Sequence, residues 1–515
     1  MQKLQSRFSM GLIALSLISG GVTAEQEVRV TVEHFVVEGE NPLDAEATRA
    51  ILARFEQQSH NLDGLQTAAK ALEEAIREKV NPFYRVILPK QNLGKSRDVA
   101  LKVISYPLGE IKVEGNEHYD KDNILAGLPH LTLNSVPDND AVVNDVKVSN
   151  YNPGKKLALT YHKLEGAGGL GADIQVKDQN PQSFSFSFNN RGTSSTGRFR
   201  LGVGYQHANL FGLDHVLNVS FSASPENVEG IKQYGVNYML PIYQTRGWLS
   251  GYWSKSDVDV GAVGDFNITG SGEMGGLHYQ QFLPQMKGYE HWVDVGWDDK
   301  LFTNTVLFGQ ENVGTSVRSM PVSVTYRSDI NGATYHSSVN LGWAKNIQGG
   351  TLNDAAAYMG NGGAKPDWDV WRYGMNMDFR LPASWMWRHQ YSGQYSTQTL
   401  IAAEQLGLGG LSSVRGYSER ETGGDVANLY KSEVWTPQWY PGVNFLAFYD
   451  QGHRFLYNPQ PGQNSTEWLR SIGVGARWSW QNNVTTSVDL AQALDEGPQT
   501  KRHTGKVHAQ VMIHF

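Results

Sequence analysis

The chain has 515 residues, of which 40% are hydrophobic and 18% are charged, and its formal net charge at pH 7 is -7. It contains no Cys, which excludes a disulfide framework and a thiolate metal site. The net charge is modest and no basic run occurs, so we do not expect the protein to bind nucleic acid.

The first residues indicate the compartment. An apolar run over residues 8–18 follows two basic residues, and Ala24 ends a stretch of small residues with the spacing of a signal-peptidase site. We therefore interpret residues 1–24 as a secretory signal peptide and expect the mature chain to begin near Glu25. The alternative is a short membrane anchor, but the run falls well short of the roughly 20 residues that a spanning helix needs.

Helix and strand patterns then alternate up to about residue 178. Apolar residues recur every three to four positions over residues 62–80, which predicts an amphipathic helix, and a second helix is expected over residues 44–56. The strands predicted around this helix pair are 29–38, 83–88 and 99–105. The predicted order is β-α-α-β-β.

The same pattern begins a second time. The tripeptide Val-Glu-Gly occurs at residues 37–39 and again at residues 113–115, about one small domain later. We therefore predict two α+β domains, over residues 25–106 and 107–180. The alternative is a single α+β domain with a chance repeat of the tripeptide.

From about residue 183 to residue 515, apolar and polar residues alternate with a period of two. Over residues 197–207, for example, Phe199, Leu201 and Val203 alternate with small or polar residues. One face of such a strand suits lipid and the other suits water, as in a transmembrane β-barrel. The mean hydropathy of -0.42 would suggest a soluble protein, but this average misleads for a barrel, because only alternate residues of a barrel face lipid. A soluble β-sandwich, which would bury the apolar face, is the structural alternative.

Two further features favour an antiparallel transmembrane β-barrel over residues 181–515. We count about 16 strands, an even number as in bacterial barrels, and the links between them alternate between short ones, such as 329–332, and long ones, such as 345–371. The last strand, over residues 506–515, is amphipathic and finishes on the aromatic residue Phe515.

The alternation also assigns charged side chains to the inner face, which would then enclose water rather than a dry core. The predicted lumen residues are Arg198, Arg200, Asp294, Asp298, Arg327, Arg477 and Asp489.

Two motifs in the predicted barrel carry a resemblance to a known family. A Gly-rich tract between the eleventh and twelfth strands ends in Val414-Arg415-Gly416-Tyr417. A later strand contains Phe448-Tyr449-Asp450-Gln451-Gly452, which fits the pattern Phe-x-Asp-x-Gly. With these motifs the chain resembles the TpsB transporters of two-partner secretion, which are the haemolysin-activator, filamentous-haemagglutinin and contact-dependent-inhibition exporters. In that family the tetrad lies at the tip of the sixth extracellular loop, which folds back into the barrel.

The resemblance covers essentially the whole mature chain. It extends to Asn189-Asn190-Arg191-Gly192 in the first hairpin and to residues 208–214 at the first periplasmic turn. It implies that the two N-terminal domains are periplasmic polypeptide-transport-associated (POTRA) domains and that the barrel has 16 strands. Family members commonly have a plug helix before the first POTRA domain, but only residues 25–27 separate the predicted cleavage site from the first strand. We therefore do not predict a plug helix for this chain from the resemblance.

The function implied by the resemblance is export of a large TpsA-type exoprotein across the outer membrane without ATP. The implied partners are this exoprotein, outer-membrane lipid and the barrel-assembly machinery, whose recognition signal the C-terminal strand with Phe515 resembles. We expect a monomer. The alternatives are an outer-membrane insertase of the BamA type, which usually has more POTRA domains, and a barrel enzyme or passive porin.

The sequence offers little for an enzyme. It has no Gly-x-Ser-x-Gly elbow, no His-Glu-x-x-His motif and no Walker A loop, and its 15 His show no metal-ligand spacing. We therefore expect no catalytic residue, cofactor or metal ion.

The two motifs predict an ion pair inside the barrel. By alternation, Asp450 points into the lumen. The loop that contains Arg415 could reach about 40 Å at roughly 3.3 Å per extended residue, and the apolar belt of a barrel is only about 25 Å tall. We therefore expect Arg415 to pair with Asp450 and to hold the loop in its folded-back position.

Overall fold

The computed structural model describes residues 29–515 except 92–96, 166–167, 193–196, 257–259, 264–265, 270–271, 285, 287, 304–306, 309–310, 313–315 and 482. The predicted signal peptide and residues 25–27 lie outside the described residues. The chain divides into two compact units, Met1–Pro107 and Leu108–Phe515. No helix in the described part of the chain is long and apolar enough to cross a membrane.

The first unit is a small α/β domain. Its sheet has the order β2-β5-β4, with β2 parallel and β4 antiparallel to β5, and helix α2 packs Leu72 and Ile76 into the core. The predicted β-α-α-β-β order is present, with one additional short strand pair. The elements are β1 (Val30–Val32), β2 (His34–Gly39), α1 (Ala45–Leu52), η1 (Ala53–Phe55), β3 (Gln58–His60), α2 (Leu62–Lys79), β4 (Tyr84–Ile87) and β5 (Asp98–Ser105).

The second unit begins with a similar α/β domain. Its sheet has the order β6-β8-β7, again with one parallel and one antiparallel pair. Its elements are β6 (Leu108–Glu114), α3 (Lys121–Ala126), α4 (Asn139–Ser149), β7 (Lys155–Lys163) and β8 (Leu170–Asp178).

The repeated Val-Glu-Gly has a structural reason. Gly39 and Gly115 end equivalent strands with φ values of 85° and 82°. A Cβ at Gly39 would lie 2.3 Å from the carbonyl oxygen of Val103, and one at Gly115 would lie 2.4 Å from that of Val176. Only glycine fits this backbone conformation and this close approach.

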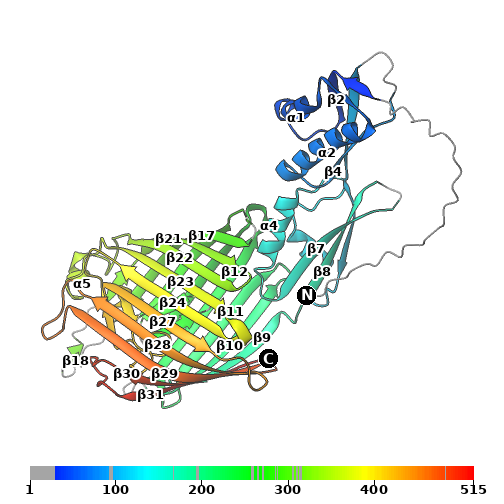
Figure 1. Ribbon diagram of the computed structural model, residues 1–515. Helices are drawn as coiled ribbons and strands as arrows, with labels where there is room; N and C mark the ends of the chain where they lie inside the picture. The colour runs from blue at the N-terminus through cyan, green and yellow to red at the C-terminus, as the bar shows by residue number, and fades with distance from the viewer. Residues whose placement is uncertain are drawn as a thin grey trace. The chain divides into compact units, whose positions relative to one another are not determined.

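The rest of the second unit is a closed antiparallel barrel of 16 strands (Figure 1), as predicted. The last strand pairs with the first, and β20 and β21 form one strand because both pair with β17. The barrel strands are β9 (Gln182–Asn189), β10 (Arg200–Leu210), β11 (His215–Ser224), β12 (Asn227–Ile242), β13 (Gly247–Ser256), β16 (Gly272–Phe282), β17 (Tyr289–Phe302), β20 (Val317–Ser319), β21 (Pro321–Asn331), β22 (Tyr335–Asn346), β23 (Asp369–Arg380), β24 (Met386–Tyr395), β27 (Val426–Trp435), β28 (Val443–Phe455), β29 (Thr466–Trp480), β30 (Val484–Ala493) and β31 (Gly505–His514).

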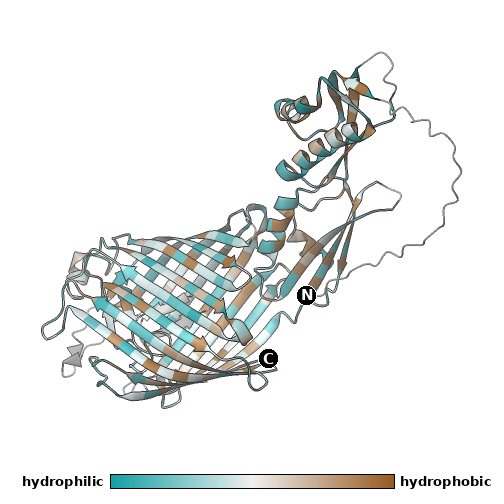
Figure 2. Ribbon diagram, viewed as in Figure 1, coloured by the Kyte–Doolittle hydropathy of each residue, from teal (hydrophilic) through white to brown (hydrophobic). Residues whose placement is uncertain are grey.

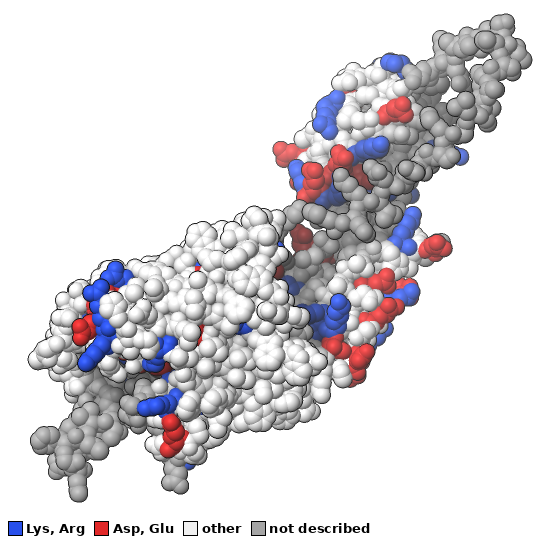
Figure 3. Space-filling model, turned by 60° about the horizontal axis from the view of Figure 1, so that its bottom comes forward, with Lys and Arg blue, Asp and Glu red and all other residues white. Residues whose placement is uncertain are grey.

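The outer face of the barrel is apolar and exposed. Phe186, Leu201 and Val295 are each 50% exposed, and Figure 2 shows hydrophobic and hydrophilic residues alternating along the strands. In Figure 3 a broad band of the barrel surface carries almost no charge, and charged residues gather toward the end with the long loops. A β-sandwich would have buried these side chains. The exposed apolar face therefore excludes a sandwich and indicates a membrane barrel.

The connections largely follow the predicted alternation. Short turns include η2 (Tyr243–Thr245) and η3 (Pro382–Ser384), and the long fifth loop contains α5 (Ala355–Met359). The second external connection departs from the pattern, because only Pro225 and Glu226 separate β11 from β12. The remaining short strand pairs in the loops are β14 (Val260–Val263) with β15 (Phe266–Thr269), and β18 (Leu307–Phe308) with β19 (Glu311–Asn312).

A buried charge pair joins the second α/β domain to the barrel. The Lys155 side chain, at the start of β7, is 0% exposed, and its Nζ lies 2.6 Å from Asp214 Oδ2 in the turn between β10 and β11. Asn123 accepts a hydrogen bond from the same Nζ at 2.8 Å, and the ring of Tyr119 lies 5.1 Å from it. Asn152 donates to the carbonyl oxygen of Ala208, near the end of β10, at 2.8 Å. Burial lowers the pKa of Lys155, and nearby Asp214 opposes that shift.

We expect Lys155→Met to loosen this joint. The change leaves the Asp214 carboxylate buried without its cation, which costs roughly 3–5 kcal/mol. Hydrogen exchange of the full-length protein in detergent should become faster at residues 208–214. Lys156→Met, at the exposed neighbouring position, is the matched control. Unchanged exchange in the Lys155 variant would show that the pair does not hold the domain.

Candidate functional site

The sixth external loop, residues 396–425 between β24 and β27, folds into the barrel. It contains η4 (Ala402–Glu404) and a small hairpin of β25 (Leu406–Leu408) and β26 (Thr422–Gly424). The tetrad lies at the tip of this loop, where Val414 and Tyr417 are fully buried and Arg415 is 1% exposed. We call this segment loop six.

Arg415 and Asp450 form the expected pair. The guanidinium Nε lies 2.7 Å from Asp450 Oδ2, and Nη2 donates to Oδ1 at 2.7 Å. The main-chain N–H of Arg415 also donates to Asp450, at 3.1 Å. Two parallel charge-assisted hydrogen bonds fix both the position and the orientation of the guanidinium.

Two further carboxylates face the third nitrogen of the guanidinium. Arg415 Nη1 lies 2.8 Å from Glu433 and 3.5 Å from Asp489. Asp489 is also 2.7 Å from Arg477, and Lys431 stands opposite Asp450 in the sheet register. The three carboxylates Glu433, Asp450 and Asp489 are therefore paired with two arginines, Arg415 and Arg477. We call Arg415 with Glu433, Asp450 and Asp489 the tip anchor.

The geometry explains the spacing of the Phe-x-Asp-x-Gly motif. Phe448, Asp450 and Gly452 all point inward from β28, and the Phe448 ring centroid lies 3.5 Å from the Arg415 guanidinium carbon. A Cβ at Gly452 would meet the side chains of Leu408 and Val414 at 3.0 Å. Phe448 thus supplies an aromatic face for the cation, Asp450 supplies its counter-ion, and Gly452 leaves space for loop six.

His508, on the last strand, also holds the tip. The N–H of Gly416 donates to His508 Nε2 at 3.1 Å, which requires a neutral imidazole with its proton on Nδ1. Alternation along the last strand, residues 506–515, places His508 on the inner face, but the sequence alone gives it no role. Glu433 was not singled out either, although alternation along β27, in which the neighbouring Val434 is exposed on the outer face, places it on the inner face.

Loops one and eight support the flanks of the tip. Arg191, within the Asn-Asn-Arg-Gly motif, lies 3.4 Å from Glu419. Glu421 accepts hydrogen bonds from the main-chain N–H groups of Gln499 and Thr500, each at 2.6 Å.

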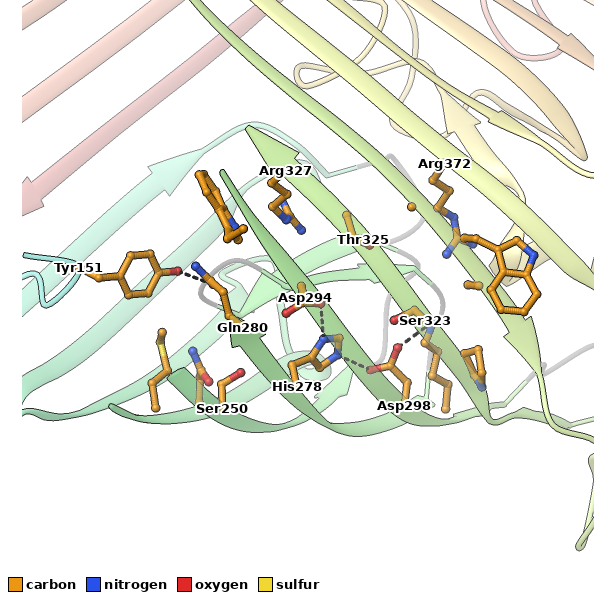
Figure 4. Close-up of a pocket in the computed structure, with 18 residues that line it drawn as sticks. Tyr151, Ser250, His278, Gln280, Asp294, Asp298, Ser323, Thr325, Arg327 and Arg372 are labelled. Carbon is orange, nitrogen blue, oxygen red and sulfur yellow. Dashed lines mark hydrogen bonds and ion pairs between the residues drawn. The ribbon is translucent and has the colours of Figure 1, made fainter. Parts of the chain in front are cut away.

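The other predicted lumen residues fall into two places. Asp294, Asp298 and Arg327 line a lumen cavity of about 510 Å³ (Figure 4). Arg200 donates to the carbonyl oxygen of Gly197 at 2.8 Å, near the outer end of β10. Arg198 precedes β10 and is exposed, so the alternation does not apply to it. The described residues contain no group of His, Asp or Glu that could hold a metal ion.

Residues 171–478 match the family of haemolysin secretion/activation proteins ShlB/FhaC/HecB. The chain belongs to this family. It is 22% identical over 475 residues to the heme/hemopexin transporter protein HuxB of Haemophilus influenzae, with 86% of this chain and 80% of HuxB covered. It is 26% identical over 226 residues to the outer membrane transporter CdiB of Dickeya dadantii, with 38% of this chain and 40% of that one covered.

Solved structures agree on the fold. CdiB from Escherichia coli superposes with a TM-score of 0.76 at 17% identity, with 97% of this chain and 93% of that one covered. The predicted resemblance to two-partner secretion transporters is therefore confirmed. This ShlB/FhaC/HecB family member is an outer-membrane transporter for two-partner secretion, with POTRA-like domains in the periplasm. Its relatives are transporters rather than enzymes.

We expect Arg415→Ala and Asp450→Ala each to release the tip of loop six. Each change leaves a charge without its partner, at a cost of roughly 3–5 kcal/mol in a dry site and less if water enters. Hydrogen exchange at residues 413–417 should rise in each single variant. Because the two side chains act as one unit, the double variant should exchange little faster than either.

Arg388→Ala is the control for this cycle, because Arg388 forms a more exposed pair with Asp378, 3.4 Å away, which does not contact the tip of loop six. Additive effects of Arg415→Ala and Asp450→Ala would contradict a single anchor.

Proposed function

We propose that this transporter binds a TpsA-type exoprotein in the periplasm and exports it through the barrel lumen without ATP. The observation that carries the proposal is the tip anchor. Loop six is bound inside the lumen by ion pairs and hydrogen bonds rather than by covalent bonds, so it can close the pathway at rest and leave it when the exoprotein enters.

The exoprotein is recognised first by the periplasmic domains. In the second domain, β6 and β7 are the outer strands of the sheet among the described residues, so each has one side that is not paired within it. An extended client can add a strand to such an edge through main-chain hydrogen bonds with little demand on its side chains. This suits a partner that must arrive unfolded.

The type of exoprotein that we propose is suggested by the transporters to which this chain is similar. HuxB is named as a heme/hemopexin transporter and CdiB as an outer membrane transporter. A secreted adhesin, a haemolysin or a contact-dependent toxin would each suit this pore. Since the periplasm offers no ATP, the driving force is folding of the exoprotein outside the cell.

Lipid and the barrel-assembly machinery complete the partners of the proposed monomer. The exposed apolar band faces outer-membrane lipid. Phe515 is 68% exposed beside the seam where β31 meets β9, and its ring centroid lies 6.0 Å from that of Phe186. We propose that the assembly machinery recognises this terminal aromatic residue.

Removing the tip of loop six should open the pore. We expect deletion of residues 407–419 to raise single-channel conductance in planar bilayers, because the deletion removes Arg415 and the segment that the tip anchor holds. Secretion of the exoprotein should be lost while heat modifiability in gels still reports a folded barrel. Unchanged conductance would mean that loop six does not close the pathway.

The periplasmic domains should bind the exoprotein through its backbone. We expect the full-length transporter in detergent to bind a fluorescent peptide from the N-terminal region of the exoprotein, measured by anisotropy. Conservative changes of the peptide side chains should alter Kd only slightly, whereas N-methylation of alternate backbone amides should abolish binding because it removes the donors of strand addition. Equal binding of the N-methylated peptide would contradict this mode.

A further inference from the structure

The base of loop six is held at a second place in the barrel. Glu404, the last residue of η4, is 2% exposed. Its carboxylate lies 2.9 Å from Arg372 Nη2 and 3.2 Å from Lys300 Nζ. Ser319 donates its hydroxyl to the same carboxylate at 2.8 Å. We call Glu404 with Lys300, Ser319 and Arg372 the base anchor.

Apolar packing surrounds the base anchor. Leu400 and Ile401 are each 1% exposed and share a core cluster with Tyr358 and Trp368 of loop five. Tyr358 accepts a hydrogen bond from the indole N–H of Trp368 at 3.2 Å and donates to the carbonyl oxygen of Arg318 at 3.1 Å. The base of loop six and loop five therefore form one packed body on the inner wall.

The cations of the base anchor belong to the lining of the lumen cavity. Lys300 and Arg372 both line the cavity of about 510 Å³ in which Figure 4 shows His278 between Asp294 and Asp298. His278 lies 2.9 Å from Asp294 and 3.1 Å from Asp298, and Lys300 lies 3.9 Å from Asp298. A continuous series of hydrogen-bonded and ion-paired side chains thus runs from the cavity to Glu404.

The two anchors use different parts of the barrel. The side chains of the base anchor come from β17, β20 and β23, whereas the carboxylates of the tip anchor come from β27, β28 and β30. No side chain belongs to both sets. Loop six therefore reaches from one side of the barrel wall to another, and release of Arg415 alone leaves its base in place over the cavity.

We infer that Glu404 is a positioning residue for transport, which holds the base of loop six and loop five over the lumen cavity independently of Arg415. The inference rests on the proposed closure of the pathway by loop six. Full opening then requires that Glu404 leave Lys300 and Arg372, and those two cations then face the pathway.

Conductance in planar bilayers tests this inference without the exoprotein. Glu404→Gln keeps the size of the side chain and removes its charge. The open probability should rise by roughly tenfold, as expected for the loss of one charge-assisted hydrogen bond. Because the anchors share no side chain, the effects of Glu404→Gln and Arg415→Ala should multiply in the double variant. The melting temperature of the barrel should stay that of the unchanged protein.

Asp378→Asn is the matched control, since it removes an inner-face carboxylate that pairs with Arg388, 3.4 Å away. It should leave the conductance unchanged. Wild-type conductance in Glu404→Gln, or a double variant no more open than Arg415→Ala, would overturn the inference. If deletion of residues 407–419 also fails to change conductance, the proposed closure itself is wrong. If that deletion opens the pore and Glu404→Gln does not, only the role of Glu404 falls.

Discussion

The central constraint on this structure is the burial of one guanidinium inside a water-lined barrel. Arg415 cannot lose its charge, so burial is tolerated only if carboxylates and an aromatic face replace the water. Glu433, Asp450 and Asp489 supply the charge and Phe448 supplies the face. These side chains come from three strands, which fixes the loop tip relative to a large part of the wall.

A buried ion network of this kind contributes little to overall stability but makes its own rupture costly. Desolvation offsets most of the attraction between the charges, whereas an unpaired charge left behind is strongly unfavourable. Such a network therefore specifies one position of loop six and resists intermediate positions. A loop held by apolar contacts alone would slide between similar positions, because apolar contacts have no direction.

The sequence predicted what depends on local patterns. The alternation predicted the barrel, the repeated Val-Glu-Gly marked two equivalent strand ends, and the two motifs placed Arg415 beside Asp450. The sequence could not predict His508, Glu433 or Glu404 as partners of loop six, because these contacts depend on strand register and on how a long loop folds. Arg198 was predicted to line the lumen and does not, because the alternating pattern in the sequence begins before the first residue of β10.

The same chemistry produces two joints of different character in this chain. Lys155 and Asp214 lie at the contact between domain and barrel, with side chains 0% and 1% exposed, and a neighbouring tyrosine and two asparagines pack around them. Water can reach that pair only if the domain leaves the barrel. Arg415 and Glu404 are also buried, but Lys300 and Arg372, the partners of Glu404, line an open cavity of the lumen. Once an entering chain displaces either residue, water can solvate the exposed charges, so the cost of rupture falls as the loop moves. Access of water, rather than the type of ion pair, therefore separates a permanent joint from one that can open.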